Sequence, residues 1–291
     1  MRPLKIVVLA KQVPDTRNVG PDAMKPDGTV NRGKLSTVFN PDDLHALELA
    51  LNIKDRIPGT KVTILTMGPQ KAADIIRDSF YRGADNGIMI SDKRFGGADT
   101  LATSYTIVQG IKKIADYDLI LGGRQAIDGD TAQVGPQCAD KLNIPQVTYV
   151  EEILEITAIG IIAKRRLEKG IETVSAPFPC LITVHGSSPK CRSRHAKNVM
   201  KYKYARSKTE LRSSDELLLS LHEKRPFLTI PEWSVEDIEA DVEKIGLAGS
   251  PTKVKSVESI VLTASEAKVL SSSNADIEGM IKELIEHHTI G

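Results

Sequence analysis

The sequence runs Gly122-Gly-Arg-Gln-Ala-Ile-Asp-Gly-Asp-Thr-Ala-Gln-Val-Gly-Pro-Gln-Cys-Ala139 directly after an apolar segment, Tyr117-Asp-Leu-Ile-Leu121. The apolar segment is typical of a buried parallel strand, and the residues after the glycine-rich turn follow a helical pattern. Open α/β sheets bind their ligands in such turns, at the carboxyl ends of their strands. Because a helix N-terminus offers free amides and a positive dipole end, the segment predicts a phosphate-bearing ligand.

Alternating strand and helix signals lead from the N-terminus to this segment. Asn40-Pro-Asp-Asp43 is expected to begin a helix, with Asn40 as its N-cap, Pro41 at its first position and two carboxylates that match its dipole. Such alternation predicts an α/β fold with a Rossmann-like parallel sheet and helices on both faces. The expected strands are 4–9, 62–66, 87–90 and 117–121, and the expected helices follow Asn40, span 70–82 and 100–115, and begin at about Thr131.

The pattern changes after Gln146. Segments 147–156, 160–168 and 171–184 are predicted to be antiparallel strands joined by glycine-containing turns, which would form a β-hairpin extension. A C-terminal helix is expected at 276–288, with an apolar stripe that either packs on its own domain or docks on a partner. We therefore divide the chain into an α/β domain at 1–232 and a C-terminal helical arm at 233–291.

The composition excludes several classes of protein. Hydrophobic residues make up 41% and charged residues 26%, which is ordinary for a soluble globular protein. A net charge of +1 gives no overall attraction to nucleic acid or membranes, and no apolar run reaches the roughly 18–20 residues of a membrane span. Cys138, Cys180 and Cys191 lack metal-ligand spacing, and their odd number favours free thiols. We expect a cytoplasmic protein without a metal site.

Several separate segments resemble the beta subunit of electron transfer flavoproteins. Gly122–Ala139 is similar to the nucleotide-binding motif of that family, and Lys11-Gln-Val-Pro-Asp-Thr16 and Asn40–Asp43 are similar to its first turn and its first helix cap. Phe95-Gly-Gly-Ala-Asp-Thr-Leu-Ala-Thr-Ser104 and Ala248-Gly-Ser-Pro-Thr252 resemble the electron-bifurcating branch in particular. The resemblance covers about residues 1–190 and returns near 233–255.

The resemblance implies a nucleotide site at the carboxyl edge of the sheet. Asn40 would touch the adenosine as well as cap its helix, and Met67 would lie near the adenine unless it only packs in the core. Asp128 and Asp130 either accept from a ribose hydroxyl or only shape the turn. The residues expected to bind the cofactor are Leu9, Ala10, Asn40, Asp42, Met67, Asp99, Thr100, Thr103, Arg124, Asp128, Gly129, Asp130, Thr131, Ala132, Gln133, Val134 and Gly135.

A second turn bears on the choice between FAD and AMP. Gly96-Gly97 leads into a helix whose first turn carries the hydroxyls of Thr100, Thr103 and Ser104, although such hydroxyls often bond only to backbone. Two neighbouring helix N-termini suit a diphosphate, whereas AMP needs one, so FAD is expected and AMP is the alternative. Arg124 is expected either near the flavin, where a cation stabilises the reduced anionic form, or in a salt bridge.

The segment 187–231 departs from the family pattern. Between Lys190 and Lys208 it carries eight basic residues and no acidic one. It is either a solvated linker or a surface that docks an acidic redox partner, because Tyr202 and Tyr204 offer little stacking for nucleic acid. The departure leaves either an acyl-CoA dehydrogenase or a 2-hydroxy acid (lactate) dehydrogenase as the FAD-dependent partner.

By this resemblance the chain is one half of a heterodimer with an alpha subunit, on which the C-terminal arm docks. NADH would give a hydride to the FAD of this chain, and the electrons would divide between the alpha-subunit FAD with its dehydrogenase and a ferredoxin or flavodoxin. Two alternatives remain, an electron carrier that holds AMP as a structural ligand and a nucleotide-binding regulatory module without redox activity. No side chain is expected to act as a catalytic acid or nucleophile.

Overall fold

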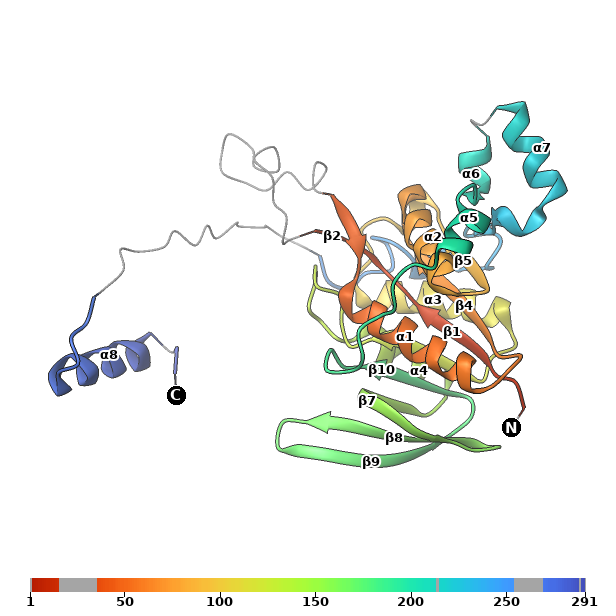
Figure 1. Cartoon of the computed structure of the whole chain (residues 1–291). Coiled ribbons are helices and arrows are strands. Elements are labelled where there is room, and N and C mark those ends of the chain that lie inside the picture. The colour runs from red at the N-terminus through yellow and green to blue at the C-terminus, as the bar shows by residue number, and fades with distance from the viewer. Residues whose placement is uncertain (1, 16–35, 213–214, 254–268, 288, 291) are drawn as a thin grey trace, which may run out of the picture.

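One large sheet with helices on both faces forms the centre of the molecule (Figure 1). The structure is a computed structural model, which describes residues 2–15, 36–212, 215–253, 269–287 and 289–290. Its sheet has the order β13-β5-β4-β1-β6-β10-β7-β8-β9. Neighbours run parallel from β13 to β7, and β8 and β9 continue the sheet as an antiparallel hairpin. The predicted Rossmann-like α/β class is confirmed.

The strands of this sheet are, in chain order, β1 (Lys5–Leu9), β4 (Lys61–Met67), β5 (Asn86–Ile90), β6 (Leu119–Gly123), β7 (Gln146–Ile156), β8 (Gly160–Leu167), β9 (Gly170–Pro177), β10 (Cys180–Val184) and β13 (Glu232–Trp233). Two small ladders join β2 (Gln12–Pro14) to β3 (Thr37–Phe39) and β11 (Arg206–Ser207) to β12 (Thr229–Ile230). The helices are α1 (Pro41–Arg56), α2 (Ala73–Arg82), α3 (Thr100–Ile114), α4 (Val134–Leu142), α5 (Ala196–Tyr202), α6 (Lys208–Leu211), α7 (Glu216–Lys224) and α8 (Asn274–Glu286).

The β1 strand shows why both faces of the sheet are covered. Ile6 and Val8 belong to the apolar cluster that includes α1 and α2, whereas Val7 and Leu9 belong to the cluster that includes α3 and α4. Side chains alternate across a strand, so four consecutive buried apolar residues need packing partners on each side. The helices therefore form two layers around the sheet.

The prediction of one antiparallel strand across 171–184 is wrong. Two strands lie there, β9 and β10, and they are separated at Phe178-Pro179, where the Phe178 amide donates to the Ile159 carbonyl at 2.8 Å. β10 returns into the parallel sheet between β6 and β7. All five of its residues are buried, as expected for a strand covered on both faces. Order along the chain does not reveal such an insertion, because β10 pairs with strands that are not its sequence neighbours.

The predicted domain boundary at 232/233 falls inside β13. Trp233 pairs with Ile90, and Val235, Ile238 and Ile245 are buried in the same cluster as α3. Residues up to about 252 therefore pack with the α/β domain. The docking arm stays a prediction for α8, in which no residue is buried.

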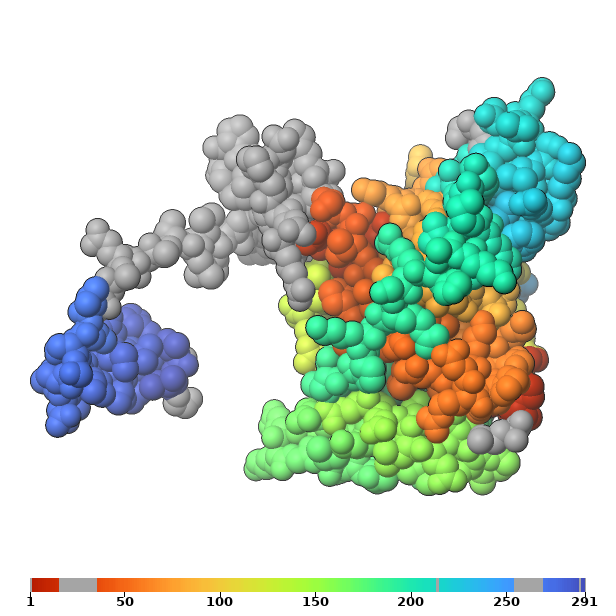
Figure 2. All heavy atoms as spheres, viewed as in Figure 1, coloured from red at the N-terminus to blue at the C-terminus, as the bar shows by residue number. Residues whose placement is uncertain are grey.

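Helix α5 packs against α2, and α6 and α7 lie beyond it (Figure 1), where α7 forms part of the cyan lobe in Figure 2. Two basic residues of the 187–231 segment face the domain instead of a partner. Arg192 pairs with Glu48 of α1 at 3.0 Å, and Arg194 pairs with Asp78 of α2. These ion pairs fasten the segment to the two helices on that face, so only its remaining basic residues are candidates for docking a partner.

Candidate functional site

The predicted ligand residues gather at the carboxyl ends of the central strands. The chain passes from β1 through α1 to β4 on one side and reaches β6 on the other side of β1, which makes the β1/β6 boundary the topological switch point. Leu9 and Ala10 lie at the end of β1, Met67 at the end of β4, and Gly123 at the end of β6. Ligands of open α/β sheets bind at this place.

The loop between β6 and α4 presents a run of free amides. The helix predicted from about Thr131 begins at Val134, because Asp130 and Ala132 have φ of 49° and 54°, a left-handed conformation that an α-helix excludes. The Asp130 amide donates to the Ala126 carbonyl at 2.9 Å, so it is not free. The amides of Thr131 to Gly135 donate no hydrogen bond to any described residue. Such a run of free amides in front of a helix suits an anion.

The two acidic residues of this loop already have partners. Lys11 Nζ lies 2.8 Å from both carboxylate oxygens of Asp128, and the Gln125 amide donates to Asp130 at 2.7 Å. Both contacts shape the loop, as one of the two predicted readings requires. A contact of either carboxylate with a ribose hydroxyl stays a prediction.

Asn40 fixes the same loop from the start of α1. Asn40 is the N-cap residue of α1, as predicted, but its side chain makes no cap hydrogen bond. Instead, its Nδ2 donates to the Gln125 carbonyl at 2.8 Å, and its Oδ1 accepts from the Ile127 amide at 3.2 Å. A buried side-chain amide that bonds to a backbone carbonyl and a backbone amide of a neighbouring loop holds that loop in one position.

Sequence reasoning missed Asp43, which it treated only as a carboxylate in the first turn of α1. Its carboxylate accepts from the amides of Lys11 at 2.8 Å and Gly123 at 3.0 Å. Burial raises the pKa of the Asp43 carboxyl to about 7, against the opposing effect of these hydrogen bonds. No local pattern identifies this role, because Asp43 contacts residues 32 and 80 positions away.

Buried polar atoms without partners lie at the same strand ends. Asp42 Oδ2 and Arg124 Nε have no hydrogen bond among the described residues and lie 3.6 Å apart as a long ion pair. Thr66 Oγ1, next to Met67 in β4, is also unpartnered. Native proteins satisfy nearly all such atoms, so a ligand with polar groups fits this place. Arg124 therefore forms the salt bridge that was one of its two predicted roles, and its Nε can still donate a hydrogen bond to a ligand.

The second predicted turn lies beside the first. Thr100 Oγ1 donates to the Gln133 side chain at 3.0 Å, and Ser104 Oγ donates to the Gln137 side chain at 2.9 Å. The first turns of α3 and α4 are therefore in contact, as the pairing of two ligand-binding turns requires.

The α3 N-terminus is, however, already capped. Asp99 accepts from the Leu101 and Ala102 amides, each at 3.0 Å, and its second oxygen accepts from the Thr252 amide and hydroxyl. The expectation of free amides is therefore wrong for Leu101 and Ala102, and the Asp99 carboxylate is fully occupied. The Thr100 hydroxyl already donates to Gln133 and accepts from Gln137, so the side-chain donor that this turn still offers a ligand is the Thr103 hydroxyl.

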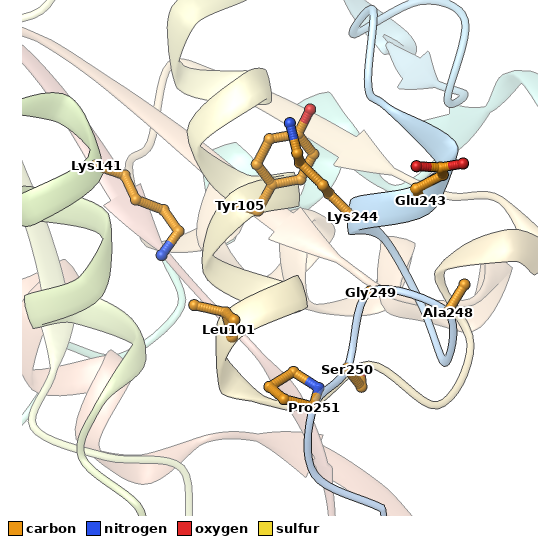
Figure 3. A pocket seen from close by; sticks show the side chains of 9 residues that line it. All are labelled: Leu101, Tyr105, Lys141, Glu243, Lys244, Ala248, Gly249, Ser250 and Pro251. Carbon is orange, nitrogen blue, oxygen red and sulfur yellow. The ribbon is translucent and has the colours of Figure 1, made fainter.

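A hollow of about 510 Å³ opens on the other side of α3 (Figure 3). Its walls are Leu101 and Tyr105 of α3, Lys141 of α4, and residues from Glu243 to Pro251. None of the predicted cofactor-binding residues lines it, so this hollow is separate from the candidate site.

Other site classes find little support in the part of the chain that the structure describes. That part contains no group of three or more His, Cys, Asp or Glu side chains arranged to bind a metal ion. Burial raises the pKa values of the Cys138 and Cys180 thiols to about 12, so neither is a ready nucleophile. None of the described helices has the length and apolar character needed to cross a membrane.

Comparison with known proteins shows the family to which the chain belongs. Residues 27–208 match the family described as the electron transfer flavoprotein domain. The chain belongs to the electron transfer flavoprotein family. Its similarity to the beta subunits of that family extends well beyond the matched domain.

Three relatives illustrate this similarity. The chain is 42% identical to the caffeyl-CoA reductase-Etf complex subunit CarD of Acetobacterium woodii over 86% of each chain. It is 42% identical to the electron transfer flavoprotein subunit beta of Clostridium acetobutylicum, over 87% of this chain and 86% of the relative. It is 38% identical to the acryloyl-CoA reductase electron transfer subunit gamma of Anaerotignum propionicum, over 99% and 100%.

Proposed function

We propose that this chain is the FAD-binding beta subunit of a bifurcating electron transfer flavoprotein. The FAD would accept a hydride from NADH and pass its electrons separately to the alpha-subunit flavin and to a ferredoxin or flavodoxin. The protein itself would bind, orient and electrostatically tune the flavin, and it needs no catalytic acid or nucleophile for this task.

The arrangement at the switch point carries the proposal. Five consecutive amides, from Thr131 to Gly135, are available to phosphate oxygens, and the Thr103 hydroxyl lies on the first turn of α3, the helix that contacts α4. Arg124 places a cation with an unpartnered Nε at the end of β6. Hydrogen-bond donors from two neighbouring turns suit a pyrophosphate better than a single phosphate.

A count of bound nucleotides tests the proposal. The chain would be produced with its alpha subunit, and FAD and AMP would be released by denaturation and quantified by chromatography. Two FAD molecules per heterodimer are expected. One FAD without any second nucleotide would refute nucleotide binding at this site.

Ala132 provides a matched pair of variants. Its φ of 54° suits glycine, whereas proline requires about −65° and has no amide hydrogen. We expect Ala132→Gly to retain the second FAD and Ala132→Pro to lose it without loss of the alpha-subunit flavin. Anaerobic titration with NADH should bleach flavin in the wild type and in Ala132→Gly. Unchanged bleaching in Ala132→Pro would place the NADH-reducible flavin elsewhere.

One observation favours a second candidate function, an electron carrier that holds AMP at this site. Because Asp99 already caps α3, the second turn contributes a hydroxyl and no amide from Leu101 or Ala102 to a second phosphate. One FAD and one AMP per heterodimer would establish this alternative.

The names of the relatives also suggest the electron acceptor. Two of them belong to caffeyl-CoA reductase and acryloyl-CoA reductase systems, so we favour an acyl-CoA type of FAD-dependent dehydrogenase over a 2-hydroxy acid (lactate) type. Reduction of each dehydrogenase by NADH through the purified heterodimer would distinguish the two.

Docking on the alpha subunit is proposed for α8. Four apolar side chains are exposed on this helix, Ile277, Met280, Ile281 and Ile285. Apolar residues at helical spacing pack on a partner when their own domain does not cover them. Ile281→Asp should reduce co-purification of the alpha subunit, whereas Lys282→Asp, an exposed neighbour, should not. Equal recovery with both variants would argue against this docking helix.

A further inference from the structure

The two central strands separate at the candidate site. The β1–β6 ladder ends at the pair Val8–Leu121, and beyond it the two strands do not pair with each other. Each strand keeps its outer neighbour, since Leu9 still pairs with Leu65 of β4 and Gly123 with Val184 of β10. The two strand ends that the ligand is expected to approach therefore lack ladder hydrogen bonds to each other.

A single carboxyl group joins these two strand ends. Asp43 Oδ2 accepts from the Lys11 amide beyond β1, and Asp43 Oδ1 accepts from the Gly123 amide at the end of β6. The side chain comes from the first turn of α1 and is buried. It therefore replaces the missing ladder hydrogen bonds between the two strands.

We propose that Asp43 is a positioning residue of the nucleotide site, whose carboxylate sets the distance between the β1 and β6 ends. The β6 end carries the loop with the free amides, and the β1 end carries Leu9 and Ala10, so their separation determines whether both reach one ligand. The proposal rests on the proposed nucleotide-binding function. It assigns no ligand contact to Asp43 itself.

The ionised form of Asp43 is the form that holds both strands. A carboxylate accepts hydrogen bonds through both oxygens. In a protonated carboxyl one oxygen is a hydroxyl, which is a weaker acceptor for the amide that faces it. Burial brings the pKa of Asp43 to about 7, so the group changes form near neutral pH. At this midpoint, about nine-tenths of the molecules are ionised at pH 8 and about one-tenth at pH 6. Binding that favours the ionised form should weaken by up to about tenfold between these values.

Other charged groups near the ends of β1 and β6 contribute to any pH dependence of ligand binding. Asp42 lies next to Asp43 on α1 and raises its pKa, and Arg124 lies 3.6 Å from Asp42. The Lys11 side chain pairs with Asp128 at 2.8 Å. His185 follows β10, next to Gly186, which approaches Asp42. The AMP phosphate titrates near pH 6 as well.

The test compares AMP binding by the full-length wild type and Asp43→Asn, using calorimetry between pH 6 and pH 8. An amide keeps the shape of the side chain but has one acceptor oxygen, so it resembles the protonated carboxyl. His185 and the AMP phosphate are common to both proteins, and the ratio of the two dissociation constants removes their effects. We expect Asp43→Asn to bind more weakly than the wild type, and the ratio of the two dissociation constants to fall severalfold, by up to about tenfold, between pH 8 and pH 6.

Glu48→Gln is the matched control. Glu48 is another buried carboxylate of α1, but it pairs with Arg192 and lies away from the strand ends. If the loss of a buried carboxylate acted only on the fold, both variants would unfold at a lower temperature, and they would bind AMP with the same affinity as each other. We expect the pH profile of Glu48→Gln to match the wild type. An unchanged ratio across pH for Asp43→Asn, or a ratio that rises toward low pH, would overturn the inference.

A second measurement applies if Asp43→Asn does not fold. AMP must lower the pH midpoint of the Asp43 carboxyl signal, observed by carbon-13 NMR of the wild type, because binding favours the ionised form. A raised or unchanged midpoint would overturn the inference while nucleotide binding stood. No binding of AMP or FAD by the wild type would instead refute the proposed function, and this inference with it.

Discussion

Adjacent glycines at the end of β6 should respond differently to the same substitution. A Cβ on Gly123 would lie 2.5 Å from the Asp42 carbonyl carbon and 2.6 Å from the Asp43 amide nitrogen. Real Cβ contacts are not that short, so the first turn of α1 would have to move by about 1 Å. Such overpacking costs about 1–3 kcal/mol, and the strained Gly123–Asp43 hydrogen bond adds about 1 kcal/mol.

We therefore expect Gly123→Ala to lower the free energy of unfolding by about 3 kcal/mol. For a chain of this length, that corresponds to a fall in unfolding temperature of roughly 6–12 °C. Gly122→Ala is the control, because its Cβ would lie 3.7 Å from the Leu9 Cβ, an ordinary contact. Urea titration of both variants measures the difference, with the control expected within about 0.5 kcal/mol of the wild type. Equal losses in the two variants would refute the close approach of α1 to β6.

Three further changes probe buried polar contacts. Asn40→Ala removes both bonds to the loop, including the one to Gln125, and should lower stability by about 2 kcal/mol in calorimetry. Arg192→Ala leaves Glu48 buried without its ion-pair partner and should lower stability by about 2 kcal/mol in urea. The raised pKa of Asp43 means that its proton stabilises the fold, fully below about pH 4 and no longer above about pH 7. Wild-type stability should therefore fall relative to Asp43→Asn across this range, by about 3 kcal/mol, as measured by unfolding at each pH.

Local sequence patterns were sufficient for much of the fold. Apolar runs such as Leu119–Leu121 and the glycine-rich turn after them predict a parallel strand that leads to a ligand loop, because periodicity and turn chemistry are local properties. The contact between the α3 and α4 N-termini also follows from this alternation. The insertion of β10 between β6 and β7 does not, since it depends on pairing between strands that are distant in sequence.

The polar residues of the site show the same limit more sharply. Asn40 and Asp43 occupy positions where a helix cap or a dipole partner is the ordinary expectation. In the structure both side chains reach across to residues 125–127, 11 and 123, which the strand order brings to the start of α1. Capping and bridging require the same residue types, so the sequence could not distinguish between them.

Asp43 also links stability and ligand binding with opposite signs. Its raised pKa shows that the ionised carboxylate is unfavourable for the folded state at neutral pH, because burial outweighs its two backbone hydrogen bonds. A neutral side chain of similar shape would remove that penalty. The same ionised form is nevertheless the one that accepts from both Lys11 and Gly123 and holds the ends of β1 and β6 at a fixed distance. A residue chosen for stability alone would not carry this charge, whereas a residue that holds two strand ends for a ligand would.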